Sequence, residues 1–340
     1  MSTSAGRWLC CAVVLSSIIV GVLSGCQETS GQSGGGAGLT TATVQAQSLK
    51  QIEQETERLR RQRDLLKAEL SPTATPATKS SLPNASATST RPPPSSGDVA
   101  GLRAGFDKLA GQLGGSLALA YATVGSAGAT QLGTWQTGPG WSTVKVPLAV
   151  AAVARADGQP DAEVLRLMRL SLTASDNAAA ERLWAYLGEP RAAAAQVQAV
   201  LRSAGDEDTL VQSQRVRPGF TAFGQTNWSL VRQAGFMARL PCVKNSHEVL
   251  ALMGDVESDQ SWGVGAVGLP AQFKGGWGPN PAGGYLVRQM GIVTLGTGSR
   301  IALAIASEPA DGLFETGADN LTALARWAVA NIKTTGSGGC

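Results

Sequence analysis

The sequence predicts one α/β domain of the α+β type, in which a mainly antiparallel sheet is assembled from both ends of a long segment. Strand-like patterns occur at residues 116–124, 130–135, 271–277, 283–295 and 300–307. Helical patterns at 99–114 and 318–333 bracket them, and residues 142–257 between the early and late strands look almost wholly helical. We therefore expect about five strands, flanking terminal helices and a ligand site beside a helical subdomain.

Composition narrows the classes of function. The chain has 340 residues, a hydrophobic content of 43% and a net charge of +3, with both signs spread along it. This balance lacks the concentrated basic surface of nucleic-acid-binding proteins, so we expect no nucleic-acid partner. His247 is the only histidine, which excludes a multi-histidine zinc site, and we expect neither a metal nor a cofactor.

The N-terminus has the pattern of an export signal. Arg7 precedes an apolar stretch at 8–23 that is too short for a good spanning helix. The following Leu23-Ser24-Gly25-Cys26 resembles the bacterial lipoprotein box, which implies fatty acyl chains such as palmitate on Cys26. The resemblance places the mature chain in the cell envelope, on the outer face of the cytoplasmic membrane. We therefore expect a lipoprotein signal peptide with its lipobox at residues 1–26; the alternative is an ordinary signal peptide with a chance cysteine.

Two cysteines remain after the signal and the anchor are set aside. Cys10 and Cys11 leave with the signal, so Cys242 and Cys340 stay in an oxidising compartment. They either pair or stay separate, because connectivity cannot be read from sequence.

Residues 27–97 have the composition of a spacer. A Gly/Ser-rich tether leads to a charged helical pattern at 48–70 and then to a Pro/Ser/Thr-rich stretch. The helix fits a solvated single helix with i,i+4 charge pairs, or a weakly self-associating stalk. We expect the folded domain at 98–334 and a flexible tail at 335–340.

Ser142 and Lys145 stand three residues apart at the start of a helical pattern. This spacing places both side chains on one face, where a desolvated lysine with a lowered pKa can act as a base for a serine nucleophile. The alternative is that Ser142 only caps the helix.

Two further motifs follow. Ser175-Asp176-Asn177 opens a second helical pattern, where capping is the simpler explanation. Lys274-Gly275-Gly276 lies on a predicted strand, where a glycine pair either forms a bulge or lets a ligand lie alongside the strand.

In this order the three motifs resemble S-x-x-K, S-D-N and K-[ST]-G of the penicillin-binding protein and class A β-lactamase family, over residues 98–334. The resemblance implies that Ser142 is the acylated nucleophile, Lys145 its proton acceptor and Ser175 a relay to the leaving group. It implies substrate contacts from Asn177, Lys274 and Gly276, and from Arg288 on the following strand. The oxyanion hole would be the backbone N–H groups of Ser142 and Trp277.

The chain departs from the family's pattern in three places. Gly275 replaces a hydroxyl residue, and only one helical segment, within 160–172, fits between the first two motifs, so the helical subdomain is trimmed. The family's hydrolytic glutamate is missing, because no Asp or Glu occurs from Thr209 through His247. Gln214 or Arg215 fills its place, and Glu207 is a weak candidate to replace it.

These patterns support two hypotheses. The first is an envelope-anchored serine hydrolase that transfers the acyl group of a β-lactam, a cell-wall peptide or an ester to Ser142, with poor deacylation. The alternative is an inactive lipoprotein of the same fold that binds a cell-wall component or a protein partner.

Overall fold

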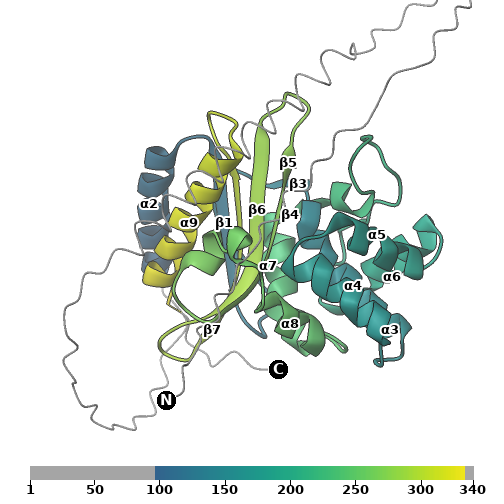
Figure 1. Ribbon diagram of the computed structural model, residues 1–340. Helices are drawn as coiled ribbons and strands as arrows, with labels where there is room; N and C mark the ends of the chain where they lie inside the picture. Colours follow the sequence, from purple (N-terminus) through teal and green to yellow (C-terminus); the bar gives the residue numbers. More distant parts are fainter. Residues whose placement is uncertain (1–95, 334–340) are drawn as a thin grey trace, which may run out of the picture. The chain divides into compact units, whose positions relative to one another are not determined.

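The computed structural model describes residues 96–333 (Figure 1). The α-helices of this part are α2 (Ser96–Leu113), α3 (Lys145–Arg155), α4 (Ala162–Thr173), α5 (Asn177–Tyr186), α6 (Pro190–Ser203), α7 (Leu230–Arg239), α8 (His247–Met253) and α9 (Phe314–Asn331). The strands are β1 (Ser116–Thr123), β2 (Thr130–Gly133), β3 (Thr137–Pro139), β4 (Asn227–Ser229), β5 (Ala271–Pro279), β6 (Tyr285–Thr294) and β7 (Arg300–Glu308). Short 3₁₀ turns are η1 (Trp141–Val144), η2 (Phe223–Gln225), η3 (Leu240–Cys242), η4 (Ser258–Gln260) and η5 (Gly263–Ala266).

The predicted sheet is confirmed. Its five strands lie in the order β2-β1-β7-β6-β5, and every neighbouring pair is antiparallel. The N-terminal strands β1 and β2 therefore complete a sheet whose other three strands come from the C-terminal end of the domain. Because β5 is an edge strand, one side of its backbone is not paired within the sheet.

Helices cover both faces of this sheet (Figure 1). On one face α9 packs against β6 and β7, with α2 beside it, over an apolar core that includes Phe106, Leu303 and Leu321. On the other face α7 packs across β1, β6 and β7, and α3 to α6 and α8 form the helical subdomain. Burial from both sides explains why β7 reads as a nearly continuous apolar run without alternation.

The segment 142–257, predicted as almost wholly helical, contains two non-helical parts. Residues 205–222 form a long loop, and β4 pairs with β3, which precedes the segment, as a two-stranded ribbon across about ninety residues of sequence. The buried Asp206 carboxylate fixes the start of the loop, because it accepts hydrogen bonds from Thr209 Oγ1 at 2.7 Å and Trp228 Nε1 at 2.9 Å. Three-residue strands leave too short a pattern to be recognised, so this part of the prediction is wrong.

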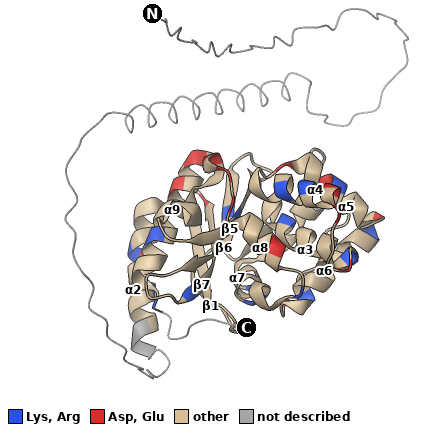
Figure 2. Ribbon diagram, turned by 60° about the horizontal axis from the view of Figure 1, so that its bottom comes forward, with Lys and Arg blue, Asp and Glu red and all other residues tan. Residues whose placement is uncertain are grey.

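Several predictions lie outside the described residues: the signal and Cys26, the spacer with its helix at 48–70, and the tail with Cys340. Helix α2 begins at Ser96, two residues before the predicted domain start, and α9 begins at Phe314, earlier than its apolar pattern. From 96 to 333 no helix is both long and apolar enough to cross a membrane. In the view of Figure 2, Lys and Arg are interspersed with Asp and Glu over the helices.

We expect Gly133→Ala to destabilise the domain. Gly133 ends β2 with φ +89°, and a β-carbon there would lie 2.4 Å from Leu117 O and 2.8 Å from the Phe106 ring. Alanine is strained in this left-handed conformation, and its β-carbon would also clash with a backbone oxygen. Together these effects should lower the free energy of unfolding by roughly 2 kcal/mol or more. The matched control is Gly101→Ala on the exposed face of α2, where nothing lies within 4 Å and a gain of about 0.5–1 kcal/mol is expected. Equal stability of the two variants in urea unfolding would contradict the assignment of strain to Gly133.

Candidate active site

Ser142 lies in the 3₁₀ turn η1, immediately before α3. Gly140 and Val144 occupy the N-cap positions of η1 and α3, and neither helix start has a side-chain cap. The partly exposed Ser142 hydroxyl makes no hydrogen bond within residues 96–333. The capping interpretation of Ser142 is therefore wrong. Its neighbour Trp141 has φ +48°, a left-handed conformation that is uncommon for a large residue and that sets the direction of the Ser142 side chain.

A buried polar network supports the turn from below. Thr143 Oγ1 donates to Gly140 O at 2.5 Å and accepts from Gln233 Nε2 at 2.8 Å. Arg288 Nη2 in turn donates to Gln233 Oε1 at 2.8 Å. The side chains of Thr143, Gln233 and Arg288 are all fully buried, so the network links α7 and β6 to the turn that carries Ser142.

Arg288 is a structural residue, which corrects the prediction that it contacts substrate. It has no exposed surface, and it also donates to Gly138 O and Pro139 O at 3.0 Å each and to Trp228 O at 3.0 Å. Burial lowers the pKa of its guanidinium to about 9. These acceptors belong to the β3–β4 ribbon, so Arg288 anchors the ribbon that leads into η1.

Two buried lysines meet at Ser175. Lys145 Nζ donates to Ser175 O at 2.5 Å and to Asn177 Oδ1 at 2.8 Å, with a longer contact to Ser175 Oγ at 3.3 Å. Lys274 Nζ donates to Ser175 Oγ at 2.8 Å and to Gly275 O at 3.1 Å. Both lysines are 0% exposed. The first, second and third predicted motifs therefore converge on one hydroxyl.

Burial changes the protonation of both amines. Desolvation lowers the pKa of Lys145 to about 7, and the charge of Asp176 only partly opposes this. Desolvation also lowers the pKa of Lys274 well below its usual range, and the nearby charge of Lys145 adds to the effect. At neutral pH a substantial fraction of Lys145 is thus an uncharged amine, the form that can accept a proton.

The residues of the second motif, Ser175-Asp176-Asn177, have different roles. Asp176 is the N-cap of α5, because its carboxylate accepts from Ala179 N at 2.6 Å, which confirms the capping interpretation for this residue. Ser175, with φ +56°, and Asn177 instead turn toward Lys145. One helix start therefore both caps itself and presents two polar groups to the lysine.

Strand β5 lies directly against the turn of Ser142. A β-carbon on Gly276 would lie 2.8 Å from Ser142 N and 3.0 Å from Gly140 O, so only glycine allows this approach. The register of β5 with β6 is continuous through Gly275 and Gly276, which excludes the bulge alternative. At Gly275 a β-carbon would meet the Trp262 ring at 2.7 Å. This aromatic ring, which the sequence did not predict, occupies the space that a hydroxyl-bearing side chain would need.

The two tryptophans beside the motifs lie in different layers. Trp141 is nearly buried and packs on Phe220, with ring centroids 5.1 Å apart. Trp277 packs with Trp262 at 5.9 Å and with Phe314 at 5.3 Å on the α9 face of the sheet. Only the Trp141 ring therefore faces the helical subdomain.

The carboxylates near the loop are engaged in ion pairs. Arg215 contacts Glu181 of α5 at 2.9 Å, one turn beyond Asn177. Glu207, the weak candidate for a hydrolytic base, is largely exposed and pairs with Arg202 at 3.6 Å. His247 is the first residue of α8, in agreement with its structural interpretation. Glu181 was missed because nothing in its local sequence distinguishes it from other exposed helix residues.

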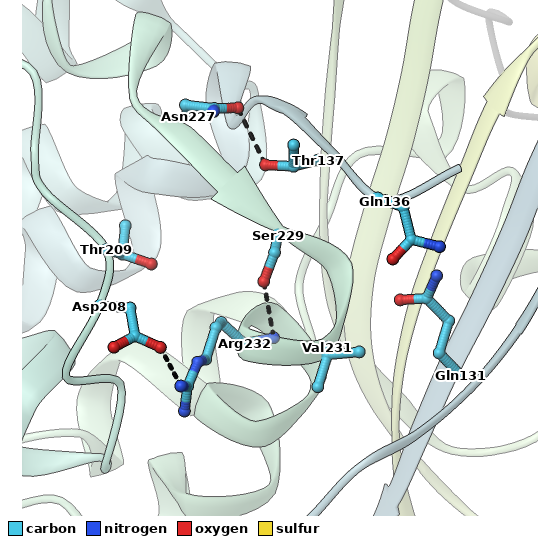
Figure 3. Close-up of a pocket in the computed structure, with 9 residues that line it drawn as sticks. All are labelled: Gln131, Gln136, Thr137, Asp208, Thr209, Asn227, Ser229, Val231 and Arg232. Atoms are coloured by element: carbon cyan, nitrogen blue, oxygen red, sulfur yellow. Dashed lines mark hydrogen bonds and ion pairs between the residues drawn. The ribbon is translucent and has the colours of Figure 1, made fainter. Parts of the chain in front are cut away.

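A separate polar pocket lies beside the β3–β4 ribbon (Figure 3). Its polar side chains largely bond one another: Thr137 Oγ1 donates to Asn227 Oδ1 at 2.9 Å, and Asp208 pairs with Arg232. None of the motif residues lines this pocket. In the described part of the chain no three His, Cys, Asp or Glu side chains gather as metal ligands.

Comparisons with known proteins identify the fold. No family model matches the chain, and no curated protein sequence does. Among solved structures, the class A β-lactamase from Mycobacterium abscessus matches with a TM-score of 0.56 at 17% identity, over 67% of this chain and 98% of the other. The TLA-3 extended-spectrum β-lactamase matches at 0.54 and 15% identity, over 68% and 99%. A variant of an ancestral class A β-lactamase of Gram-negative bacteria matches at 0.52 and 20%, over 68% and 97%.

The chain therefore has the β-lactamase-like fold, as the motifs predict. Two helices, α3 and α4, stand between Ser142 and Ser175, in line with the short spacing of the first two motifs. At these identities the likeness establishes the fold and leaves the activity to the geometry of the site.

We expect Arg288→Met to destabilise the domain strongly. The change removes the donor of two partly buried backbone carbonyls, of the buried Trp228 carbonyl and of the buried Gln233 side chain, and each unsatisfied buried acceptor costs about 1–3 kcal/mol. The loss in the free energy of unfolding should exceed roughly 3 kcal/mol in urea titration. Arg103→Met on the exposed face of α2 is the control and should change stability by less than about 0.5 kcal/mol. A fully stable Arg288→Met protein would show that the ribbon does not depend on this residue.

Proposed function

We propose that this chain is a serine hydrolase that acts by acyl transfer through Ser142 on a β-lactam, a cell-wall peptide or an ester. The observation that carries the proposal is the hydrogen-bonded set of Lys145, Ser175 and Lys274 beside the unbonded Ser142 hydroxyl. A serine nucleophile needs a base that can accept its proton, and Lys145 lies one helical turn away with its pKa lowered to about 7.

In the proposed reaction, Ser142 Oγ attacks the substrate carbonyl carbon and its proton passes to Lys145 Nζ. The carbon–nitrogen or carbon–oxygen bond of the substrate then breaks, and the proton reaches the leaving group through Ser175. No hydrogen bond joins Ser142 and Lys145 in this structure, so one side chain rotates first. The neutral amine has only two N–H donors, which favours release of its longest contact, the 3.3 Å one to Ser175 Oγ.

The backbone N–H groups of Ser142 and Trp277 would stabilise the oxyanion. Ser142 N lies in the first turn of a helix, where N–H groups have no intrahelical acceptor. Gly276, the residue before Trp277, is in near contact with that nitrogen. The free edge of β5 thus borders the position that the substrate carbonyl would take.

The acyl-enzyme should persist. The loop 205–222 carries Asp206, Glu207 and Asp208, but Asp206 is buried on Thr209 and Trp228 and the other two pair with arginines. Glu181 of α5 is held by Arg215. Because no unpaired carboxylate of the loop is available to activate water, deacylation would be slow.

The proposal also covers the attachment of the chain to a membrane. We propose that Cys26 carries the lipid and that the domain acts in the cell envelope, on the outer face of the cytoplasmic membrane. The support comes from Leu23-Ser24-Gly25-Cys26 and from the spacer composition of residues 27–97.

The alternative of an inactive binding protein is less favoured. Two lysines buried side by side destabilise a fold unless their placement serves a purpose, since each loses hydration and both repel. A protein that only binds would not need to retain this unfavourable arrangement.

Acylation can be tested directly on the full chain. After addition of a fluorescent penicillin, we expect one covalent label, seen as a mass increase of the intact protein that decays slowly. Ser142→Ala should remove the label, whereas Ser126→Ala in an exposed turn should leave it unchanged. Absence of label with β-lactams and activated esters alike would refute the proposed function.

The label should form faster as pH rises. Lys145 must be neutral to accept the proton, so the acylation rate constant should increase about tenfold per pH unit below its pKa of about 7 and level off above it. Lys145→Ala should slow acylation by about 10²–10⁴-fold and remove this step from the pH profile. A rate that is flat from pH 5 to 9 in the unmodified chain would exclude Lys145 as the base.

A further inference from the structure

Arg217 lies across the residue that precedes the nucleophile. Its guanidinium carbon is 5.9 Å from the centroid of the Trp141 ring and 4.7 Å from that of Phe220. Its Nη1 donates to Pro279 O at 2.6 Å. The side chain therefore spans from the loop 205–222 to the end of strand β5, held by two aromatic faces and one hydrogen bond.

Strand β5 gives the distance from Arg217 to the nucleophile. A β-carbon on Gly276 would lie 2.8 Å from Ser142 N, and one on Gly278, which faces the same side, would lie 2.6 Å from the Trp141 ring. Two residues along a strand span about 7 Å. The Arg217 guanidinium lies over the Trp141 ring. It is therefore about 7 Å farther along β5 than Ser142, toward the end of the strand that points away from Lys274.

This end of the strand faces the acyl part of a substrate. In the proposed reaction Ser175 passes a proton to the leaving group, and Ser175 is hydrogen-bonded to Lys274. The leaving group therefore lies toward Lys274. The acyl side chain then extends the other way along β5, toward Pro279 and Arg217.

Arg217 keeps its charge available. The arginines around it pair with carboxylates: Arg215 with Glu181, Arg232 with Asp208 and Arg202 with Glu207. Arg217 has no carboxylate within 4 Å among residues 96–333, and its Nη2 and Nε make no hydrogen bond there. Unlike the buried Arg288 it is partly exposed. A guanidinium fixed on aromatic faces, with unused donors, suits bidentate recognition of a carboxylate.

We propose that Arg217 is a specificity-determining residue that selects acyl donors with a carboxylate in the acyl side chain. This inference rests on the proposed function, because the acyl end of the site is defined by the direction of the leaving group. The ligand class is an amide, lactam or ester whose acyl side chain is anionic. The recognition is separate from the chemical step, since Arg217 does not touch Ser142, Lys145 or Ser175.

The test compares two penicillins that differ only in a side-chain carboxylate, a phenylacetyl and a phenylmalonyl derivative. Acylation rate constants of the full chain are measured by intact-protein mass spectrometry. We expect the carboxylated compound to react about tenfold faster, which corresponds to one charge-assisted bidentate contact. Arg217→Gln should bring the ratio of the two rates close to one, and Arg217→Lys should restore part of it. Arg215→Gln, the ion-paired neighbour in the same loop, is the control and should keep the wild-type ratio.

A structural role for Arg217 would slow both compounds equally and leave their ratio unchanged, which would overturn the inference. Binding to the full chain carrying Ser142→Ala gives a readout that needs no acylation. Calorimetry should show tighter binding of the carboxylated compound and loss of that preference when Arg217→Gln is added. If the preference depends on Arg217 but the unmodified chain forms no adduct, the proposed function fails and the inference stands. If adducts form but neither rates nor affinities distinguish the compounds, the inference fails and the proposed function stands.

Discussion

The site depends on the desolvation of two lysines that share one serine. Lys145 and Lys274 lie on different elements, a helix start and an edge strand, and both donate to Ser175. Burial lowers the pKa of both amines, and the charge of Lys145 lowers that of Lys274 further, whereas the charges of Asp176 and Asp259 only partly oppose these shifts. Their donors are satisfied by neutral oxygens of Ser175, Asn177 and Gly275, which tolerate loss of the charge. A pair of this kind is stable only where rigid backbone holds those oxygens in place.

The rigidity comes from layers that meet beneath Ser142. Arg288 on β6 and Gln233 on α7 connect through Thr143 to the turn η1, all without contact to solvent. Glycine at 276 lets β5 approach the same turn from the side. Because the support uses a buried guanidinium and backbone carbonyls, the position of Ser142, the proposed nucleophile, is coupled to the sheet, the ribbon and α7 together. A change in any of the three would move Ser142 relative to Lys145.

The loop 205–222 carries the arginines that border the site. Arg215 is bound to Glu181 on the helix that carries the second motif, so the carboxylate closest along that helix is neutralised by a cation. Arg217, two residues later, crosses Trp141 and reaches Pro279. The loop thus presents guanidinium groups beside Glu181 and Trp141. Under the proposed function, such a site would attract anionic substrates and release acyl groups slowly.

Local sequence patterns were enough to predict the sheet, its bracketing helices and the three motifs, because long apolar runs and helix starts leave strong local patterns. They also predicted that the three motifs lie together, and in the structure Lys145, Ser175 and Lys274 are joined by hydrogen bonds. Three features could be seen only in the folded chain: Arg288 is a structural anchor, Trp262 fills the space over Gly275, and Arg217 lies on Trp141. These outcomes depend on contacts between residues far apart in the chain, and an arginine has the same local pattern whether its charge is buried, paired or available to a ligand.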